Sequence, residues 1–204
     1  MLFYDTPNPA PNPRRVRILA AEKGITLPTQ TIAIREGEHR REAYLKINPL
    51  GQTPALALED GTVLTESVSI CRYLDLLHPQ PPMFGTSPIE VATIDQWIRR
   101  IELRLMTAVG AIWVHTHPFT ARTVPKQYTD YGESNRPIVD RALAMCDTQL
   151  KETPFIAGEA YTMADVVLLT TIDFATFIGV TLPEELAALN DWHRRVTARA
   201  SSAA

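Results

Sequence analysis

The 204-residue chain contains 45% hydrophobic and 21% charged residues, which is typical of a globular protein with one large or two small domains. Its 20 lysines and arginines against 23 aspartates and glutamates give a formal net charge of -3, which argues against a nucleic-acid-binding surface or a polybasic membrane anchor. No apolar run approaches the roughly 20 residues of a transmembrane helix, and the N-terminus lacks the cationic flank of a signal peptide, so we expect neither.

The N-terminal part of the chain alternates short strands with helices. In chain order the sequence predicts a strand over 2–4, a helix over 14–23, a strand over 29–34, a helix over 39–46, strands over 55–58 and 63–64, and a helix over 67–77. The first helix ends at Gly24, and Asp60 with Gly61 forms a typical hairpin turn. The order βαβαββα predicts an α/β sandwich.

The second part of the chain has a different pattern. Prolines concentrate over 79–88, which predicts a linker. Beyond the linker, helical periodicity predicts helices over 90–106, 136–150, 163–177 and 184–197, with no convincing strand between them. We expect an irregular loop over 117–131 and a frayed tail over 200–204. These features predict an all-helical domain over 89–204.

The chain has only two cysteines, Cys71 and Cys146, without metal-ligand or redox-motif spacing. This pattern argues against a disulfide framework and a zinc site, and it favours a reducing, cytoplasmic setting. Cys71 occupies a core-like position of an amphipathic helix, so we expect it to be packed rather than redox-active.

A proline stands directly before the strand predicted over 55–58. Such a proline can simply mark a strand edge or a turn. The alternative is a cis Thr53–Pro54 bond, which would turn the backbone N–H and C=O of Thr53 outward to pair with an extended peptide ligand.

Thr65, Glu66 and Ser67 open the helix predicted over 67–77. In one interpretation Ser67 only caps the helix. In the other, Ser67 and the helix N-terminus hold a ligand carboxylate while Glu66 faces an ammonium group. The sequence alone leaves both interpretations open.

Two further segments mark helix starts. Thr162 and Asp165 form a capping box before an apolar run, which is a structural feature. The proline-rich segment over 6–13 fixes a loop between the first strand and the first helix, a common location for anion-binding groups.

Together these segments resemble the glutathione transferase family over nearly the whole chain. The matching motifs are Pro-Asn-Pro-Arg-Arg-Val over 11–16, Ala-Glu-Lys-Gly over 21–24, Gly-Glu-His over 37–39, the segment 48–56, Glu-Ser over 66–67, and Phe-Ile-Ala-Gly over 155–158 with Thr-Met-Ala-Asp over 162–165. Within the family the chain is most similar to theta/nu-like enzymes, in particular an atypical fungal-type branch.

The resemblance implies an α/β plus all-α fold with two domains. A thioredoxin-like N-terminal domain over 1–78 would bind glutathione. After the linker over 79–88, the all-helical domain over 89–204 would shape the electrophile pocket and the dimer interface of a homodimer.

The resemblance also implies glutathione-binding residues: His39, Gln52, Thr53, Pro54, Glu66 and Ser67. Thr53, before Pro54, would pair with the cysteinyl backbone, and Glu66 with Ser67 would take the γ-glutamyl end. His39 would face the glycine carboxylate with Gln52 nearby. The alternative for His39 is an exposed histidine at a helix start.

The chain departs from the family at the group that lowers the thiol pKa. By the family spacing, the position of the usual hydroxyl or thiol side chain falls on Ala10, which has no donor. Asn12 matches an asparagine of the nu-like branch and can donate from its amide. Thr6 and Asn8 are polar alternatives, whereas Tyr4 lies in a strand and is not expected to activate the thiol.

His115 is the catalytic candidate from the helical domain, because it lies near the end of the helix that faces the thiol in the family. A neutral imidazole could take the thiol proton directly or through a water. Alternatively, His115 and His117 are exposed residues at the negative end of a helix dipole. No further ligands accompany this pair, so we expect no metal.

We therefore interpret the chain as a cytoplasmic glutathione transferase for detoxification, which conjugates the glutathione thiolate to small electrophilic apolar compounds. Glutathione would be the co-substrate, with no nucleic-acid or membrane partner. The alternatives are a glutathione-dependent isomerase or dehalogenase, or a non-catalytic glutathione-binding protein that lost its chemistry with the hydroxyl at Ala10.

Overall fold

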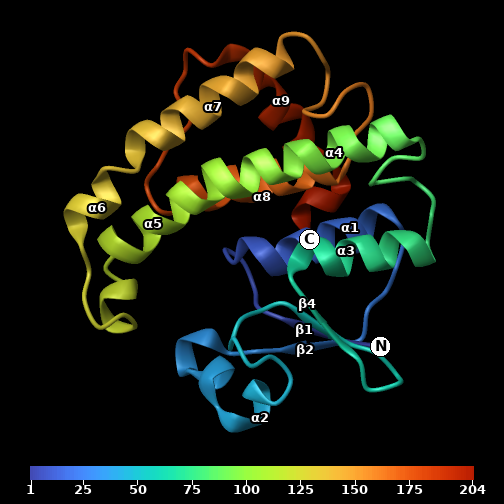
Figure 1. The fold of residues 1–204 in the computed structure, drawn as a ribbon, viewed down its shortest axis with the longest axis vertical. Coiled ribbons are helices and arrows are strands. Elements are labelled where there is room, and N and C mark those ends of the chain that lie inside the picture. Colours follow the sequence, from blue (N-terminus) through green and yellow to red (C-terminus); the bar gives the residue numbers. More distant parts are fainter. The chain divides into compact units, whose positions relative to one another are not determined.

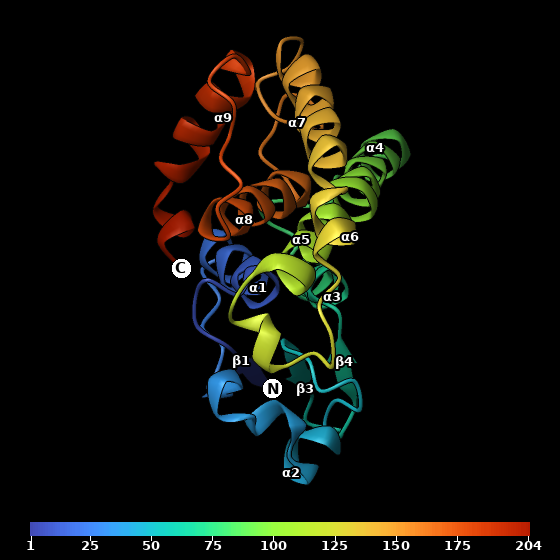
Figure 2. The same ribbon diagram turned by 90° about the vertical axis from the view of Figure 1, so that its left-hand side faces the viewer.

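The computed structural model describes every residue of Met1–Ala204 and divides the chain into two compact units. The first unit contains Met1–Phe84 together with Arg199–Ala204, and the second contains Gly85–Ala198. Figure 1 and Figure 2 show a sheet with helices in the first unit and helices alone in the second. This is the predicted combination of a thioredoxin-like domain and an all-helical domain.

The first unit contains a four-stranded sheet in the order β2-β1-β3-β4. Its elements are β1 (Leu2–Asp5), α1 (Pro11–Glu22), β2 (Thr29–Thr31), the 3-10 turns η1 (Ile34–Glu36) and η2 (Glu38–Arg40), α2 (Glu42–Leu45), β3 (Ala55–Ala57), β4 (Val63–Thr65), α3 (Ser67–Leu77) and the C-terminal 3-10 turn η5 (Ala200–Ala203). β1 and β2 are parallel, and the other two pairs are antiparallel. The predicted order of strands and helices is confirmed.

The two faces of the sheet are covered by different segments. Figure 1 shows α1 and α3 side by side on one face and the segment with α2 on the other. On the α2 side a core forms around Tyr4, Ile32, Tyr44 and Ala55, and the rings of Tyr4 and Tyr44 meet edge to face at 5.9 Å. Tyr4 is therefore a core residue, as expected for a strand side chain.

α1 begins at Pro11, three positions before its predicted start at residue 14. Pro11 and Pro13 both lie in the first turn, where backbone N–H groups have no intrahelical partner. A missing N–H therefore costs little there, and the fixed φ of proline suits a helix. Of the four prolines that predicted a loop over 6–13, Pro7 and Pro9 lie in the loop and Pro11 and Pro13 lie in the first turn of the helix.

The C-terminal tail is ordered, so the prediction of a frayed tail over 200–204 is wrong. Arg199 donates two hydrogen bonds of 2.8 Å to the carboxylate of Glu22 at the end of α1, and the Ser201 hydroxyl also donates to Glu22. Arg14 donates to the carbonyl oxygen of Ser202 at 2.8 Å. The last residues, which the sequence groups with the helical domain over 89–204, belong to the first unit.

Replacing Glu22 by glutamine tests this tail contact. Burial alone would raise the pKa of Glu22, but the hydrogen bonds from Arg199 and Ser201 outweigh it and hold that pKa below its ordinary value of 4.5. Since the folded-state pKa is depressed, the contact stabilises the fold above pH 4.5, and its contribution is lost as the pH falls below that value. We expect Glu22→Gln to lower the free energy of unfolding by about 1 kcal/mol near neutral pH.

Urea denaturation between neutral pH and about pH 3 measures this loss. The free energy of unfolding of the variant should also fall less steeply with decreasing pH, because the titrating carboxylate is gone. Glu36→Gln is the matched control, because the carboxylate of Glu36 is exposed and makes no hydrogen bond. Equal losses in the two variants would contradict a specific role of Glu22.

The second unit consists of helices. They are α4 (Pro88–Arg100), a π-helical segment η3 (Ile101–Met106), α5 (Thr107–Thr116), the 3-10 turn η4 (Thr120–Arg122), α6 (Thr129–Glu133), α7 (Arg136–Leu150), α8 (Met163–Phe177) and α9 (Ala187–Thr197). α7 and α8 have the predicted bounds. α4, η3 and α5 follow one another without a break, so this helical stretch extends ten residues past its predicted end at 106.

α8 is the central helix of this unit. Its apolar residues are buried on nearly every side, and it packs against α4 and α9 (Figure 1). A helix that is apolar all round belongs inside a protein. No helix of the chain combines the length and the hydropathy that a membrane crossing requires.

Candidate functional site

The candidate site lies at one end of the sheet, where β1 ends, β3 begins and β4 ends. Ala55 is the register partner of Tyr4 in β1 and of Thr65 in β4. Thr53 immediately precedes β3 and Ser67 closely follows β4, so both lie beyond this same end. Strand pairing thus brings together residues that are far apart in the sequence.

Thr53 is held at this end by a chain of hydroxyl groups. Its Oγ1 donates to Oγ1 of Thr6 at 2.9 Å, and Thr6 donates in turn to the carbonyl oxygen of Ile32 at 3.2 Å. The peptide bond between Thr53 and Pro54 is cis, which confirms the prediction. Neither the N–H nor the carbonyl oxygen of Thr53 bonds to another backbone group, so both remain for a ligand.

The backbone just before Thr53 is held in place by hydrogen bonds to Gln52. The carbonyl oxygen of Gln52 accepts two hydrogen bonds of 2.7 Å, from the Tyr44 hydroxyl and from the amide of Asn48. Asn48 is buried. Burial of Tyr44, together with the neighbouring Tyr4, raises the pKa of the Tyr44 hydroxyl to about 12, so this hydroxyl stays protonated and donates. The backbone of Gln52 is therefore rigid while its side chain is exposed.

His39 lies in η2, beside the same segment. Gly51, with φ of 59°, approaches the carbonyl oxygen of His39 so closely that a Cβ there would be 2.8 Å away. The imidazole is half-buried, and its Nδ1 is buried without a hydrogen-bond partner. Burial, with a smaller effect of Arg40, lowers the pKa of His39. A buried ring nitrogen without a partner is costly, and a ligand oxygen could satisfy it.

Glu66 and Ser67 form the start of α3. Glu66 is the N-cap residue, and it is the only non-glycine residue with a positive φ, at 65°. Such backbone strain is characteristic of functional sites. Glu66 is exposed, whereas Ser67 is 5% exposed and its hydroxyl accepts a hydrogen bond from Arg15 at 3.3 Å. Ser67 follows the N-cap position, so it does not serve as the side-chain cap.

The loop between β1 and α1 is clamped by Arg17. Its guanidinium donates to the carboxylate of Asp5 at 2.5 Å, to the carbonyl oxygen of Thr6 at 3.2 Å and to the side-chain oxygen of Asn8 at 2.5 Å. Thr6 and Asn8, the alternative thiol-activating residues, are thus engaged within the loop itself.

Asn12 is the polar side chain of the first turn of α1 that remains available. It is half-buried, and its amide makes no hydrogen bond. Ala10 is the N-cap residue of α1 and has no side-chain cap. Because Pro11 and Pro13 lack an N–H, backbone donors are sparse in this turn. A side-chain donor such as Asn12 would therefore matter more here than at an ordinary helix start.

His115 lies near the end of α5 in the second unit. Its Nδ1 accepts a hydrogen bond of 3.3 Å from the backbone N–H of Tyr128, and its ring packs edge to face on Tyr128 and Tyr131. A neutral imidazole that accepts at Nδ1 carries its proton on Nε2. In this arrangement His115 offers a donor to a ligand, and it would have to give up the Tyr128 contact to accept a proton at Nδ1.

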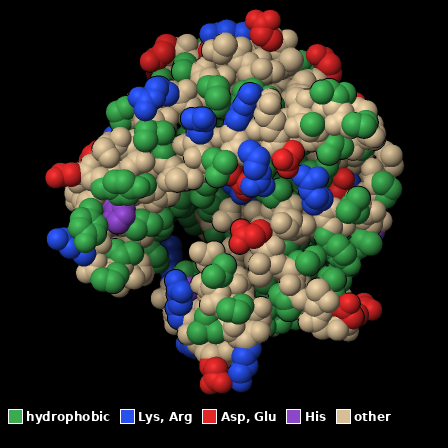
Figure 3. Space-filling model, viewed as in Figure 1, with side chains coloured by type: hydrophobic (Ala, Val, Ile, Leu, Met, Phe, Trp, Pro, Cys, Tyr) green, Lys and Arg blue, Asp and Glu red, His purple; other side chains and the backbone are tan.

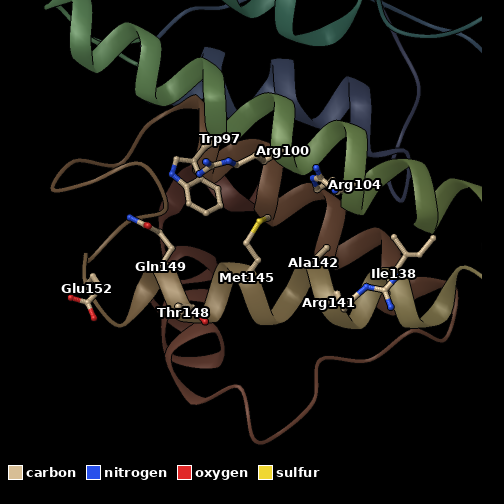
Figure 4. A pocket seen from close by; sticks show the side chains of 10 residues that line it. All are labelled: Trp97, Arg100, Arg104, Ile138, Arg141, Ala142, Met145, Thr148, Gln149 and Glu152. Carbon is tan, nitrogen blue, oxygen red and sulfur yellow. The ribbon is translucent and has the colours of Figure 1, made fainter.

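A groove lies within the second unit, between the α4–η3 stretch and α7 (Figure 4). It measures about 840 Å³ and is lined by Trp97, Arg100, Arg104, Ile138, Arg141, Ala142, Met145, Thr148, Gln149 and Glu152. Figure 3 shows lysine and arginine side chains on this face of the unit. None of the predicted glutathione-binding residues lines this groove, so its size does not make it the glutathione site.

No group of three or more histidine, cysteine, aspartate or glutamate side chains is arranged to hold a metal ion. His115 and His117 each accept a backbone N–H at Nδ1, from Tyr128 and Phe119 respectively. The pair is thus part of the loop structure after α5.

Comparisons with known proteins find glutathione S-transferases similar to this chain over most of its length. The family model for the glutathione S-transferase N-terminal domain matches residues 10–77, and the model for the C-terminal domain matches residues 95–195. Glutathione S-transferase 2 of Saccharomyces cerevisiae is 34% identical over 204 residues, which cover 98% of this chain and 87% of that protein. Glutathione S-transferase theta-2 of Homo sapiens is 31% identical over 190 residues, which cover 91% and 76%.

A solved structure has nearly the same fold. It is a glutathione S-transferase domain-containing protein of Marinobacter aquaeolei, with a TM-score of 0.94 and 36% identity, covering 98% of this chain and 99% of that one.

Proposed function

Because the chain belongs to the glutathione S-transferase family, we propose that the sheet end around Thr53 and Ser67 is the glutathione site of this transferase. The enzyme uses glutathione as co-substrate, and we propose small, apolar electrophiles as its second substrates. The observation that carries the site is the free backbone N–H and carbonyl of Thr53 next to the N-terminus of α3. An extended peptide with a terminal carboxylate fits this combination.

Glutathione has two carboxylates, one ammonium group and one thiol, and the site offers a group for each. Ser67 and the free N–H groups of α3 would take the γ-glutamyl carboxylate, and exposed Glu66 would face the ammonium group. Thr53 and Pro54 would pair with the cysteinyl backbone. His39 and Gln52 would face the glycine carboxylate, because the close approach of Gly51 to the carbonyl oxygen of His39 brings their two segments together.

In the reaction the glutathione thiolate attacks an electrophilic carbon. A sulfur–carbon bond forms, and in a substitution the leaving group departs with the electron pair of its bond. Because a free thiol has a pKa of about 8.5, the enzyme must stabilise the thiolate. We propose Asn12 as the main donor, with His115 as a second candidate that donates from Nε2.

Replacing Ser67 tests the glutathione site. Ser67→Ala removes a charge-assisted hydrogen bond, so we expect about a tenfold loss of glutathione affinity by calorimetry. Glu66→Ala should weaken binding as well, because it removes the carboxylate that faces the ammonium group. Ser69→Ala is the matched control: this serine is exposed on the same helix and should bind as the parent does. Unchanged affinity in both site variants would defeat the assignment.

We also propose that the enzyme is a homodimer. Large apolar side chains are exposed on both units, with Leu76 75%, Ile89 73% and Leu103 67% exposed. Apolar side chains of this size on α3, α4 and η3 are candidates for burial against a second copy. We expect sedimentation at micromolar concentration to give twice the chain mass of 22.8 kDa. A single species of the chain mass would refute the dimer.

A cytoplasmic role in detoxification completes the proposal. Cys71 and Cys146 are both unpaired and buried, which suits a reducing compartment. Burial raises the pKa of both thiols, that of Cys146 to about 12, so neither is a reactive thiolate that would compete with glutathione.

A further inference from the structure

Arg15 is a buried cation directly behind the proposed carboxylate site. It lies in α1, its residue is 2% exposed, and its Nη1 donates to Oγ of Ser67 at 3.3 Å. Its charge also reaches the next turn of α3: burial raises the pKa of Cys71, and the charge of Arg15 partly opposes this rise. The hydrogen bond to Ser67 places the guanidinium at the start of α3.

Burying a guanidinium in the core costs more free energy than burying an apolar side chain there. Removing a charge from water costs several kcal/mol unless partners compensate, and an apolar side chain of similar volume often serves stability equally well. The two neighbouring arginines have other roles, since Arg14 holds the C-terminal tail and Arg17 clamps the loop after β1. Arg15 donates to Ser67 at the start of α3.

The hydrogen bond to Ser67 has a directional consequence. A hydroxyl group has one hydrogen to donate and two sites that accept. The oxygen of Ser67 accepts a hydrogen bond from Arg15. The hydroxyl hydrogen of Ser67 therefore points away from Arg15. The start of α3 is the site at which a carboxylate would accept it. The positive charge of Arg15 also adds to the positive end of the α3 dipole.

We propose that Arg15 is a positioning residue for the γ-glutamyl carboxylate of glutathione. It does not touch the substrate: it orients the Ser67 hydroxyl as a donor and supplies a cation behind the α3 N-terminus. This inference rests on the proposed glutathione site and adds a residue to it.

The test is a double-mutant cycle on glutathione affinity, measured by calorimetry on the full chain. Arg15→Met should weaken binding about tenfold, and Arg15→Lys, which keeps the charge but loses the planar fork, about threefold. In the Ser67→Ala background Arg15→Lys should alter affinity less than twofold, because the hydroxyl that Arg15 orients is gone and the charge is kept. Arg15→Met should there keep only the smaller loss that comes from the missing cation. Arg14→Met is the matched control on the same helix, and its effect should be the same with or without Ser67.

Two glutathione analogues separate positioning from a general structural role. In 4-aminobutyryl-cysteinylglycine the γ-glutamyl carboxylate is absent, and this analogue should bind the parent and Arg15→Lys equally. In glutaryl-cysteinylglycine only the amine is absent, and this analogue should still lose affinity in Arg15→Lys. Circular dichroism identifies variants that do not fold. If Arg15→Met does not fold, the test relies on Arg15→Lys alone.

The outcomes distinguish the inference from the site on which it rests. If the parent protein does not bind glutathione, the proposed site itself fails. If the parent binds but Arg15→Lys loses the same affinity with and without Ser67, or with both analogues, Arg15 is only structural and the inference is overturned.

Discussion

Replacing Asn12 by alanine is expected to lower kcat/KM for glutathione conjugation about a hundredfold, which is the usual effect of removing one preorganised donor to a developing anion. The reason lies in the first turn of α1. Its N-cap residue Ala10 carries no donor, and Pro11 and Pro13 lack an N–H. The unbonded amide of Asn12 is therefore the donor whose loss the turn cannot replace.

The ultraviolet absorbance of enzyme-bound thiolate, followed across pH, measures this effect directly. Loss of Asn12 should raise the pKa of the bound thiol, so the thiolate forms and turnover rises only at higher pH. Each unit of that rise corresponds to about 1.4 kcal/mol of lost thiolate stabilisation. Glutathione affinity should change much less than turnover, because Asn12 interacts with the ionised sulfur.

His115 and Ala10 provide the comparisons. His115→Ala should also reduce turnover, and Ala10→Ser should be tolerated or activating, since it places a hydroxyl at the position where the family has one. If the thiol pKa moves in His115→Ala and stays unchanged in Asn12→Ala, the activation belongs to His115. If both variants keep the parent pKa and turnover, the backbone N–H of Asn12 suffices.

Elements with a strong local pattern could be predicted from the sequence to the residue. α3, α7 and α8 have the predicted bounds because an apolar period of a helix and clear end signals coincide in each. The C-terminal tail could not be predicted, since its small residues carry no periodicity. Its order comes from Arg199 and Ser201 binding Glu22, and that contact joins residues from opposite ends of the chain.

In the candidate site, too, residues with a local sequence signal differ from residues whose role depends on packing. Thr53, Pro54, Glu66 and Ser67 could be proposed from the sequence because each is part of a local motif with its own signal. Arg15 and Arg17 were missed as supporting residues, because their partners are set by how α1 packs on α3 and on the loop after β1. One signal was present: Arg15 interrupts the apolar stripe of α1, where a charged side chain requires a buried partner.

Replacing Asp165 by alanine is expected to lower the free energy of unfolding by about 4 kcal/mol, which is more than the loss of an ordinary helix cap. The carboxylate of Asp165 is fully buried and accepts from the backbone N–H groups of Ile156 and Thr162 at 3.0 and 2.9 Å, from the Thr162 hydroxyl at 3.1 Å and from the indole of Trp192 at 2.9 Å. The alanine variant would leave these donors buried without an acceptor.

The capping box of α4 is the matched comparison, because it has the same local geometry at the surface. Ser87 accepts from the backbone N–H of Glu90, and the Glu90 carboxylate accepts from the backbone N–H of Ser87. In Ser87→Ala, water can replace the lost partner, so we expect a loss of only about 1 kcal/mol. Chemical denaturation of both variants measures the difference, which reflects burial rather than the cap itself.

Asp165→Asn separates the acceptor atoms of this side chain from its volume. The amide has nearly the same shape, but its NH₂ group would face donors where the carboxylate has an oxygen. We therefore expect most of the loss seen in Asp165→Ala to persist in Asp165→Asn, whereas glutathione affinity of the folded fraction stays at the parent value. If Asp165→Ala abolished glutathione binding at unchanged stability, Asp165 would be a binding residue. A structural role predicts lost stability with unchanged binding, because the four bonds of this carboxylate join the start of α8 to α9 and to the segment just before α8.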